Sequence, residues 1–420
     1  MPSSRASALA PFRVRSFRFQ WPSDLATSLA FEMEALILGW YVLTTTGSVQ
    51  LLVLVGALAW LGSLFSPFFG IAGDRIGVRT MLCITRGVYA LLAAALAALT
   101  LSGELQPWHV LVVAGIAGLM KPSDMAMRHV LVGHTMRPEA LMGALGLSRT
   151  TSDTARVAGA IAGTGGVALI GMGPAYLVVA AIYVGAFLLS LGVSAPPRAA
   201  DGQTQANQVI AGLKDGVQYV WEKPALLGAF SMAFLVNLLA YPFFLGLLPY
   251  VARDVYGLGQ GGLGYLAGAF AVGALAGSLL VSANRVPLRA ARVMLASGAV
   301  WFLGIILFGQ FQSVPVGLAL LFTIGFVQSF CLTPLAAVML RASSEEMRSR
   351  VMGIRMLAIW GLPLGLVIAG PLIAGLGFAA TTLIYAGLGL AATIAIGARC
   401  HRARCQRAPM AIVAARPSPA

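Results

Sequence analysis

The sequence predicts an all-α membrane protein rather than a soluble domain. Of its 420 residues, 59% are hydrophobic and only 10% are charged, whereas ordinary globular domains carry roughly 25% charged residues. Its mean hydropathy is +0.86, and 49 Gly and 21 Pro are spread through apolar runs, where membrane helices tolerate them. These runs are continuous and do not alternate at every second residue, which disfavours a transmembrane β-barrel. The composition excludes soluble enzymes, disordered chains and secreted disulfide-stabilised domains.

Twelve apolar segments are long enough to cross a bilayer, at roughly 20 residues each. They are 22–43, 50–71, 80–101, 108–128, 142–169, 174–194, 224–249, 259–282, 292–311, 314–340, 351–374 and 377–397. The longest polar gap divides them into two groups of six. The predicted organisation is a basic tail (1–21), a six-helix bundle (22–194), a cytoplasmic linker with an amphipathic helix (195–223), a second six-helix bundle (224–397) and a basic tail (398–420).

The distribution of basic residues predicts the topology. With the N-terminus inside, the segments on that side hold 25 of the 28 Lys and Arg, and the outside loops hold only Arg253. Lys121 and Arg156 fall within spans. Because basic residues collect in cytoplasmic loops, this asymmetry places both termini in the cytoplasm. The net charge of +14 therefore reflects topology and not nucleic-acid binding. Only three of the 28 are Lys, a composition typical of GC-rich bacteria, so the bacterial inner membrane is the expected location.

The two halves carry related patterns. Residues 73–79 read GDRIGVR after the second segment, and residues 283–289 read ANRVPLR after the eighth. Glu139 and Gly146 before the fifth segment are matched by Glu346 and Gly353 before the eleventh. Parallel six-helix repeats are a known transporter architecture, in which the substrate site lies between the halves near the bilayer midplane.

Residues 70–79, GIAGDRIGVR, resemble the G-x-x-x-D-R-x-G-R-R signature of the major facilitator superfamily, with Val78 in place of the first paired Arg. The resemblance implies a conformational latch formed by Gly70, Asp74, Arg75, Gly77 and Arg79. In this latch, the Asp74 carboxylate would meet the cytoplasmic N-terminus of the eleventh segment, an end that attracts anions. The alternative is that Asp74 and its Arg neighbours are a solvated topology signal.

Residues 156–166, RVAGAIAGTGG, resemble the Gly-rich motif of antiporter subfamilies, with Ala160 in place of the usual Pro. Its glycines, Gly159, Gly163, Gly165 and Gly166, are expected to allow close helix packing. Further stretches, TGS at 46–48 and RSRVMG at 348–353, resemble the branch of the superfamily that contains the enterobactin exporter and multidrug efflux proteins. The resemblance therefore implies efflux of a drug, siderophore or metabolite.

Two acids near the middle of the first segment are candidates for proton coupling. Ionisable groups within spans are functional suspects, because each costs roughly 2.5–3.5 kcal/mol on insertion scales. Glu32 and Glu34 lie about 200° apart on a helix, so only one of them can face a central cavity. The sequence favours Glu34, whose carboxyl group would load and release a proton as access alternates. The alternative role is a structural hydrogen bond or a counter-ion for Arg156.

Two further pairs of charges fall within spans. Lys121 and Asp124 are three residues apart on the fourth segment, and Asp153 and Arg156 are three apart on the fifth, so each pair shares a helix face. They predict a crossed network of four charges that either neutralises itself or binds substrate. Arg156 is the expected ligand of an anionic substrate, because its planar fork matches carboxylates and catecholates.

The prediction from sequence is a secondary active transporter that exports a small organic molecule in exchange for protons. No phosphate-binding loop of the form G-x-x-x-x-G-K-[ST] occurs, so ATP is not the expected energy source. We expect no enzyme activity, cofactor or metal site, and a monomer whose partners are its substrate and the lipid bilayer. Two alternatives remain: an uptake permease or facilitator on the same fold, and a non-transporting membrane scaffold or lipid-remodelling protein.

Overall fold

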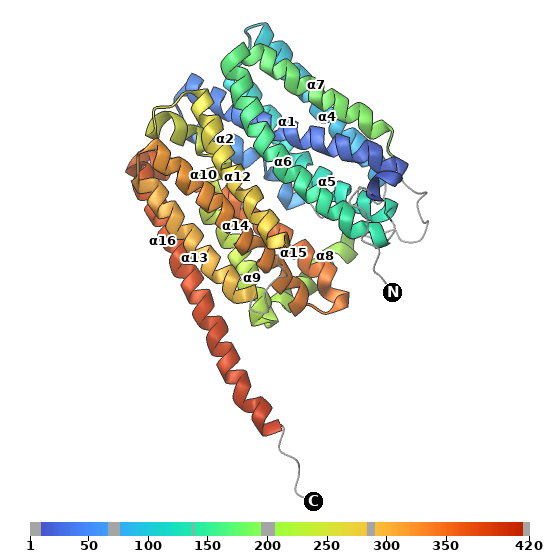
Figure 1. Ribbon diagram of the computed structural model, residues 1–420, viewed down its shortest axis with the longest axis vertical. Coiled ribbons are helices and arrows are strands. Elements are labelled where there is room, and N and C mark those ends of the chain that lie inside the picture. The colour runs from blue at the N-terminus through green and yellow to red at the C-terminus, as the bar shows by residue number, and fades with distance from the viewer. Residues whose placement is uncertain (1–9, 66–75, 137, 195–205, 284–289, 415–420) are drawn as a thin grey trace, which may run out of the picture.

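The protein is a pair of helical bundles that lie at an angle to each other (Figure 1). The computed structural model describes residues 10–65, 76–136, 138–194, 206–283 and 290–414, and these ranges contain helices and no strand. In hydrocarbon the backbone N–H and C=O groups have no water to bind, and a helix satisfies them within one segment. The all-α fold expected from the composition is therefore what forms.

The N-terminal bundle, blue to green in Figure 1, begins after the short 3-10 helix η1 (Ala10–Arg13). Its elements are α1 (Arg15–Thr46), α2 (Val49–Leu58), η2 (Leu61–Phe65), α4 (Val78–Leu101), α5 (Pro107–Thr135), α6 (Pro138–Ile170) and α7 (Met172–Leu191). Within this bundle α1 packs against α6 and α7, and α4 packs against α5 and α7. The first segment thus lies among most of the others, which lets its side chains reach several helices.

The linker helix α8 (Ala206–Glu222) bends by 111° into the first helix of the C-terminal bundle. This bundle consists of α9 (Pro224–Leu235), η3 (Val236–Ala240), α10 (Pro242–Leu245), α11 (Leu248–Tyr250), η4 (Val251–Val255), α12 (Gln260–Ala283), α13 (Ala290–Gln310), α14 (Val314–Ala342), η5 (Glu345–Met347), α15 (Arg348–Leu357), η6 (Ala358–Trp360) and α16 (Gly361–Ala414). On the cytoplasmic side, Asp215 of α8 accepts a hydrogen bond from Arg350 of α15 at 3.2 Å. The linker is therefore tied to the second bundle.

By length and apolar composition, eight helices of the described ranges are able to cross a membrane, or nine if the bent pair of α8 and α9 is one span. Three features separate nine from the twelve predicted segments, and one of them is that α6, the fifth segment, is not among these helices. Helix α16 runs through Gly377, where φ is 81°, and so contains the twelfth segment and most of the eleventh. Helix α2 is only 10 residues long before its break. Every predicted segment overlaps a described helix, and the count of twelve stays a prediction.

The two bundles meet through two symmetric helix pairs. Helix α6, the fifth predicted segment, packs on α12, the eighth, while α2, the second, packs on the first part of α16, the eleventh. Exchanging the halves converts one pair into the other, as a parallel repeat requires. Small residues permit the contact: a Cβ built on Gly56 would lie 3.1 Å from Leu366, and one on Gly370 would lie 2.8 Å from Val53.

A cluster of four charges joins three helices inside the N-terminal bundle. Arg86 of α4 binds Asp24 of α1 and lies 3.3 Å from Asp124 of α5, and Arg128 of α5 also pairs with both acids. The side chain of Asp124 is fully buried, and that of Arg86 is 1% exposed. Two acids balance two bases, so the cluster carries no net charge into the membrane. The sequence analysis named only Lys121 and Arg156 as bases within spans, whereas the structure also directs the side chains of Arg86 and Arg128 into the bundle.

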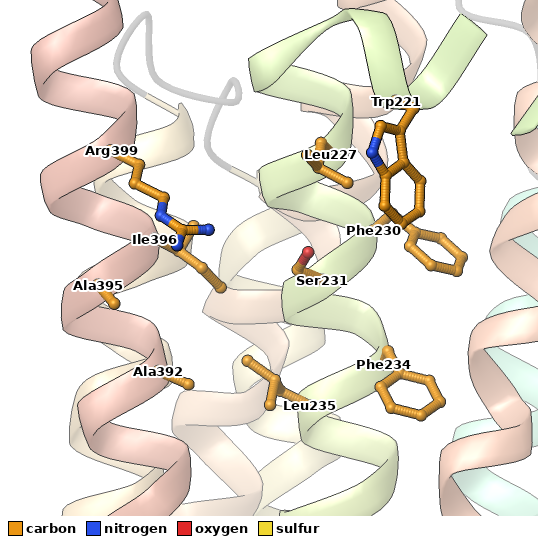
Figure 2. A pocket seen from close by; sticks show the side chains of 10 residues that line it. All are labelled: Trp221, Leu227, Phe230, Ser231, Phe234, Leu235, Ala392, Ala395, Ile396 and Arg399. Carbon is orange, nitrogen blue, oxygen red and sulfur yellow. The ribbon is translucent and has the colours of Figure 1, made fainter. Parts of the chain in front are cut away.

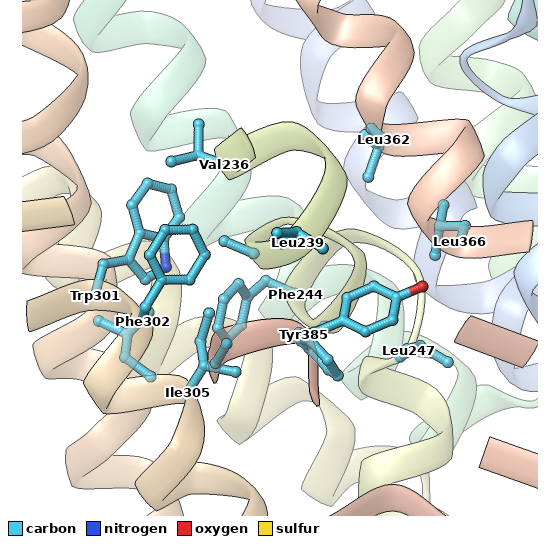
Figure 3. Close-up of a cluster of buried hydrophobic side chains, with 14 of the residues drawn as sticks. Val236, Leu239, Phe244, Leu247, Trp301, Phe302, Ile305, Leu362, Leu366 and Tyr385 are labelled. Carbon is cyan, nitrogen blue, oxygen red and sulfur yellow. The ribbon is translucent and has the colours of Figure 1, made fainter. Parts of the chain in front are cut away.

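The core of the C-terminal bundle is apolar instead (Figure 3). Trp301 and Phe302 of α13 meet Val236 and Leu239 of η3, and Tyr385 of α16 donates a hydrogen bond to the Gly365 carbonyl at 2.7 Å. The seventh predicted segment within this bundle is broken. Its π-helical stretches, η3 and η4, flank the short helices α10 and α11, which begin at or beside Pro242 and Pro249.

Two of the four glycines of the fifth segment lie against α1. A Cβ built on Gly159 would lie 2.6 Å from Cβ of Glu32, and one on Gly163 would lie 2.7 Å from Cα of Met33. A Cβ on Gly165 would meet no atom within 4 Å, and one on Gly166 would make only ordinary contact with Ala175. The close packing expected of all four glycines therefore holds for Gly159 and Gly163 and is wrong for the other two.

We expect Gly163→Ala to lower the stability of the protein, because its new methyl group collides with the α1 backbone. Overpacking of this kind costs typically about 1–3 kcal/mol. Gly165→Ala is the matched control on the same helix, and it should be neutral or stabilising, since Ala favours helix by up to about 1 kcal/mol over Gly. Thermal unfolding of both variants in detergent measures the difference, and equal melting temperatures would contradict this account of the α1–α6 contact.

We expect Asp124→Asn to destabilise the protein strongly, because it leaves Arg86 and Arg128 with one carboxylate between them inside the membrane. Removing one partner of a buried ion pair costs about 3–5 kcal/mol. Asp254→Asn is the control, since its carboxylate is 32% exposed beside Arg253 and surface pairs contribute about 0–1 kcal/mol. Unfolding followed by circular dichroism compares the two, and similar stability would show that the buried cluster does not hold the bundle.

Candidate functional site

An ion pair between α1 and α6 is the most open charged contact within the membrane-spanning helices of the N-terminal bundle. Nε of Arg156 donates to Oε1 of Glu32 at 3.4 Å, and the two side chains are each 32% exposed. The close approach at Gly159, one turn beyond Arg156, brings the two helices near enough for this contact. Because neither partner is enclosed, water or a substrate has access to the pair, in contrast to the buried cluster around Asp124.

Lys121 of α5 adds a second cation to this region. Its Nζ lies 4.2 Å from the ring centroid of Trp60 and 5.1 Å from that of Phe31. It also lies within electrostatic range of Glu32 and Arg156. An ammonium over an aromatic face is attracted by the ring quadrupole, so the Trp60 and Phe31 rings partly replace the carboxylate partner that a buried Lys would otherwise need.

The site faces the C-terminal bundle. Trp60 packs against a hydrophobic cluster that joins α2 to the C-terminal core, and Arg156 lies within electrostatic range of Tyr241. Tyr241 directly follows the π-helix η3, and its ring meets Trp301 edge-to-face at 5.3 Å. The charged side chains of α1, α5 and α6 therefore lie at the boundary between the halves, on the side of the broken seventh segment.

Glu34, the acid that the sequence analysis favours for the cavity, points in another direction. Its two carboxyl oxygens accept hydrogen bonds from the hydroxyls of Tyr176 at 2.5 Å and Tyr183 at 2.8 Å. Both tyrosines belong to α7, two helical turns apart on one face, and Tyr183 also contacts Tyr89 of α4. Glu34 is thus held within the N-terminal bundle, and Glu32 is the acid at the interface.

The crossed network predicted from Lys121, Asp124, Asp153 and Arg156 does not form. Asp124 binds Arg86 and Arg128 rather than Lys121. Asp153 accepts a hydrogen bond from Ser278 of α12 at 3.1 Å, across the two halves. Arg156 pairs with Glu32 instead. The expectation failed because residues three apart share a face of one helix, but the partners on neighbouring helices decide which charges meet.

The predicted latch lies only partly within the described residues. Gly70, Asp74 and Arg75 fall outside them. Gly77 has φ of 95°, a conformation that favours glycine, and it begins α4 as the N-cap residue. Arg79 donates to the carbonyl of Leu191 in the last turn of α7, at 2.8 Å. One residue of the motif thus joins two helices of its own bundle.

Sequence reasoning missed several polar residues that the structure brings together: Asp24, Arg86, Arg128, Tyr176 and Tyr183. Asp24 gave a usable signal, since it is an acid two residues inside the first predicted segment. The tyrosines gave none, because an aromatic residue in a span more often packs or faces lipid. In the part of the chain that the structure describes, no group of three or more His, Cys, Asp or Glu is arranged to hold a metal ion.

Known transporters resemble this chain in sequence. The multidrug efflux pump Tap of Mycolicibacterium fortuitum is 28% identical over 367 residues, which cover 82% of this chain and 86% of that protein. Its similarity therefore extends over both bundles.

Solved structures share the fold at low sequence identity. The nucleoside transporter NupG superposes with a TM-score of 0.72 at 16% identity, covering 91% of this chain and 98% of its own. The D-xylose-proton symporter gives 0.71 at 13% identity, with 91% and 97% covered. The human organic anion transporter MFSD10 (TETRAN) gives 0.59 at 17% identity, with 92% and 99% covered. The family model of the Major Facilitator Superfamily matches residues 23–362, and the chain accordingly belongs to that superfamily as a multi-pass membrane transporter.

Proposed function

We propose that the chain is a proton-coupled exporter of small, partly apolar organic molecules, acting as a monomer in a bacterial cytoplasmic membrane. The single observation that carries the proposal is the half-exposed Glu32–Arg156 pair at the boundary between the bundles. The 28% identity to a protein named as a multidrug efflux pump supports the direction. In this scheme the two bundles rock about the boundary, and the pair is exposed to each side in turn.

The pair supplies a means of coupling. When Glu32 takes up a proton it loses its charge, and the attraction that holds it to Arg156 disappears. A positively charged or hydrogen-bond-donating substrate competes with that proton for the same carboxylate. Because proton and substrate exclude each other, one enters as the other leaves, and an inward proton gradient drives export.

For an anionic substrate, the direction of transport relative to the proton reverses. A carboxylate or catecholate would bind Arg156 only after Glu32 has been protonated and has released it, so proton and anion would travel together. An uptake permease is therefore the second candidate function. It is favoured by the two cations near the boundary, Arg156 and Lys121, which could both attract an anion, and by the presence of a D-xylose-proton symporter among proteins of the same fold.

Glu32→Gln should abolish gradient-driven export of a lipophilic cation from proteoliposomes, because the variant has no carboxylate for which proton and substrate compete. Coupling between sites is typically 5–150-fold, so a loss of roughly tenfold or more is expected. Arg156→Gln should reduce coupling but leave movement down the substrate's own gradient. The measurement is uptake of a fluorescent lipophilic cation into inverted proteoliposomes, with and without an imposed pH gradient.

Glu34→Gln is the matched control, two residues away on the same helix. It should retain the response to the pH gradient, with lower protein stability from its weakened bonds to the tyrosines. Loss of coupling only in Glu34→Gln would overturn the assignment of Glu32. Cation movement that ignores the gradient would overturn proton coupling, and gradient-driven accumulation of a catecholate siderophore together with protons would replace export by the uptake function. Neither probe moving in wild type would show that the substrate belongs to neither of these two chemical classes.

The motif at residues 70–79 gives a separate prediction. We propose that Asp74 latches the bundles at the cytoplasmic N-terminus of the eleventh segment, where unpaired backbone N–H groups favour an anion. Helix η2 ends nine residues before Asp74 and already contacts α15. Asp74→Asn should therefore slow transport at unchanged expression, while Asn284→Ala at the equivalent position of the second half should not. Transport by Asp74→Asn at the wild-type rate would leave the residue as a topology signal.

A further inference from the structure

A groove on the periphery of the C-terminal bundle has no part in the proposed transport site. It has a volume of about 380 Å³ and lies between α9 and the second half of α16 (Figure 2). Leu227, Phe230, Leu235 and Ile396 form its apolar walls, and Trp221 and Arg399 lie at one end. The volume is within the ordinary range of ligand pockets, about 300–1,000 Å³.

The position of the groove relative to the membrane surface follows from helix length. Gly377 marks the kink at which the last predicted segment begins, and Arg399 lies 22 residues further along α16. At 1.5 Å per residue this is roughly 33 Å, slightly more than the roughly 30 Å hydrocarbon core. Arg399 is therefore at headgroup level on the cytoplasmic side. Trp221, which is 68% exposed and precedes the start of α9, is at the same level, where membrane proteins commonly carry Trp.

The positive charge of Arg399 at this end of the groove has no partner in the described part of the chain. Within the described ranges, Arg399 has no hydrogen-bond or ion-pair partner, and Figure 2 shows its side chain reaching from α16 toward α9, across the groove. The walls deeper in the membrane carry only one polar side chain, Ser231. A ligand that fits both parts has an anionic head beside Arg399 and an apolar chain that runs toward the bilayer centre.

We propose that this groove binds an anionic phospholipid of the cytoplasmic leaflet, with its phosphate on Arg399 and one acyl chain along α9 and α16. The guanidinium fork matches a phosphate oxygen pair, and attraction of one basic residue to an anionic leaflet is worth about a fivefold change in affinity. The lipid bridges the first helix of the C-terminal bundle and its last, which are not consecutive in the chain. This proposal does not depend on the direction or coupling of transport.

Native mass spectrometry of the full-length protein in detergent tests the site, with phosphatidylglycerol and the zwitterionic phosphatidylcholine as probes. Wild type should retain phosphatidylglycerol more tightly than phosphatidylcholine. Arg399→Gln should weaken phosphatidylglycerol binding about fivefold and weaken phosphatidylcholine less, because choline already balances the charge of that lipid's phosphate. Ala392→Phe, which fills the groove without altering charge, should weaken both. The matched control is Arg292→Gln, which removes an exposed Arg of α13 outside the groove and should change neither.

Three results would overturn the proposal. Equal loss of phosphatidylglycerol in Arg399→Gln and Arg292→Gln would show that diffuse positive charge retains the lipid. Unchanged binding in Ala392→Phe would place the lipid elsewhere on the surface. Displacement of the bound lipid by a transported lipophilic cation would assign the groove to substrate. The first two results leave the Glu32 experiment untouched, because lipid retention is measured without transport.

Discussion

The constraint on which the rest of the structure depends is that a charge inside the bilayer must find a partner there. An unpaired charge costs several kcal/mol in hydrocarbon, and the N-terminal bundle meets this cost in two different ways. Asp24, Arg86, Asp124 and Arg128 form a closed, neutral cluster with almost no exposure. Glu32 and Arg156 form a pair that remains partly open. A closed cluster holds helices together, whereas an open pair is able to exchange partners.

Helix α1 connects these arrangements, since it presents three acids to four neighbouring helices. Asp24 faces α4 and α5, Glu32 faces α6, and Glu34 faces α7. The Gly159 and Gly163 contacts fix how near α6 lies to this helix, and the two tyrosine bonds to Glu34 fix its rotation. With the rotation held from opposite sides, Glu32 has little freedom to turn away from the boundary. In the proposed cycle, Glu34 positions α1 and Glu32 carries the proton.

The sequence was sufficient for the fold because hydropathy and the distribution of Arg report directly on the bilayer. It could not assign charge partners, since these depend on which helices are adjacent and how each is rotated. Lys121 illustrates the difficulty: spacing predicted Asp124 as its partner, but the structure gives it two aromatic rings from α1 and η2. The different surroundings of Glu32 and Glu34 depend on adjacency and rotation in the same way. Their 200° separation was predictable, while the direction of the cavity required the packing of α6 and α7.

The two bundles contribute unequally to the proposed cycle. The N-terminal half holds the buried ion cluster, and breaking that cluster would strand charges inside the membrane. The C-terminal half places an irregular segment opposite, in which η3, α10 and α11 contain no acid or base and are interrupted by π-helical turns. Such turns are frequent at functional sites. An apolar core of Phe and Leu side chains also tolerates repacking better than an ion cluster does, because repacking leaves no charge without a partner. In the proposed cycle, the N-terminal half supplies the proton chemistry and the C-terminal half supplies an adaptable backbone. Tyr241, which follows η3 and lies within range of Arg156, is where the two halves of this proposal meet.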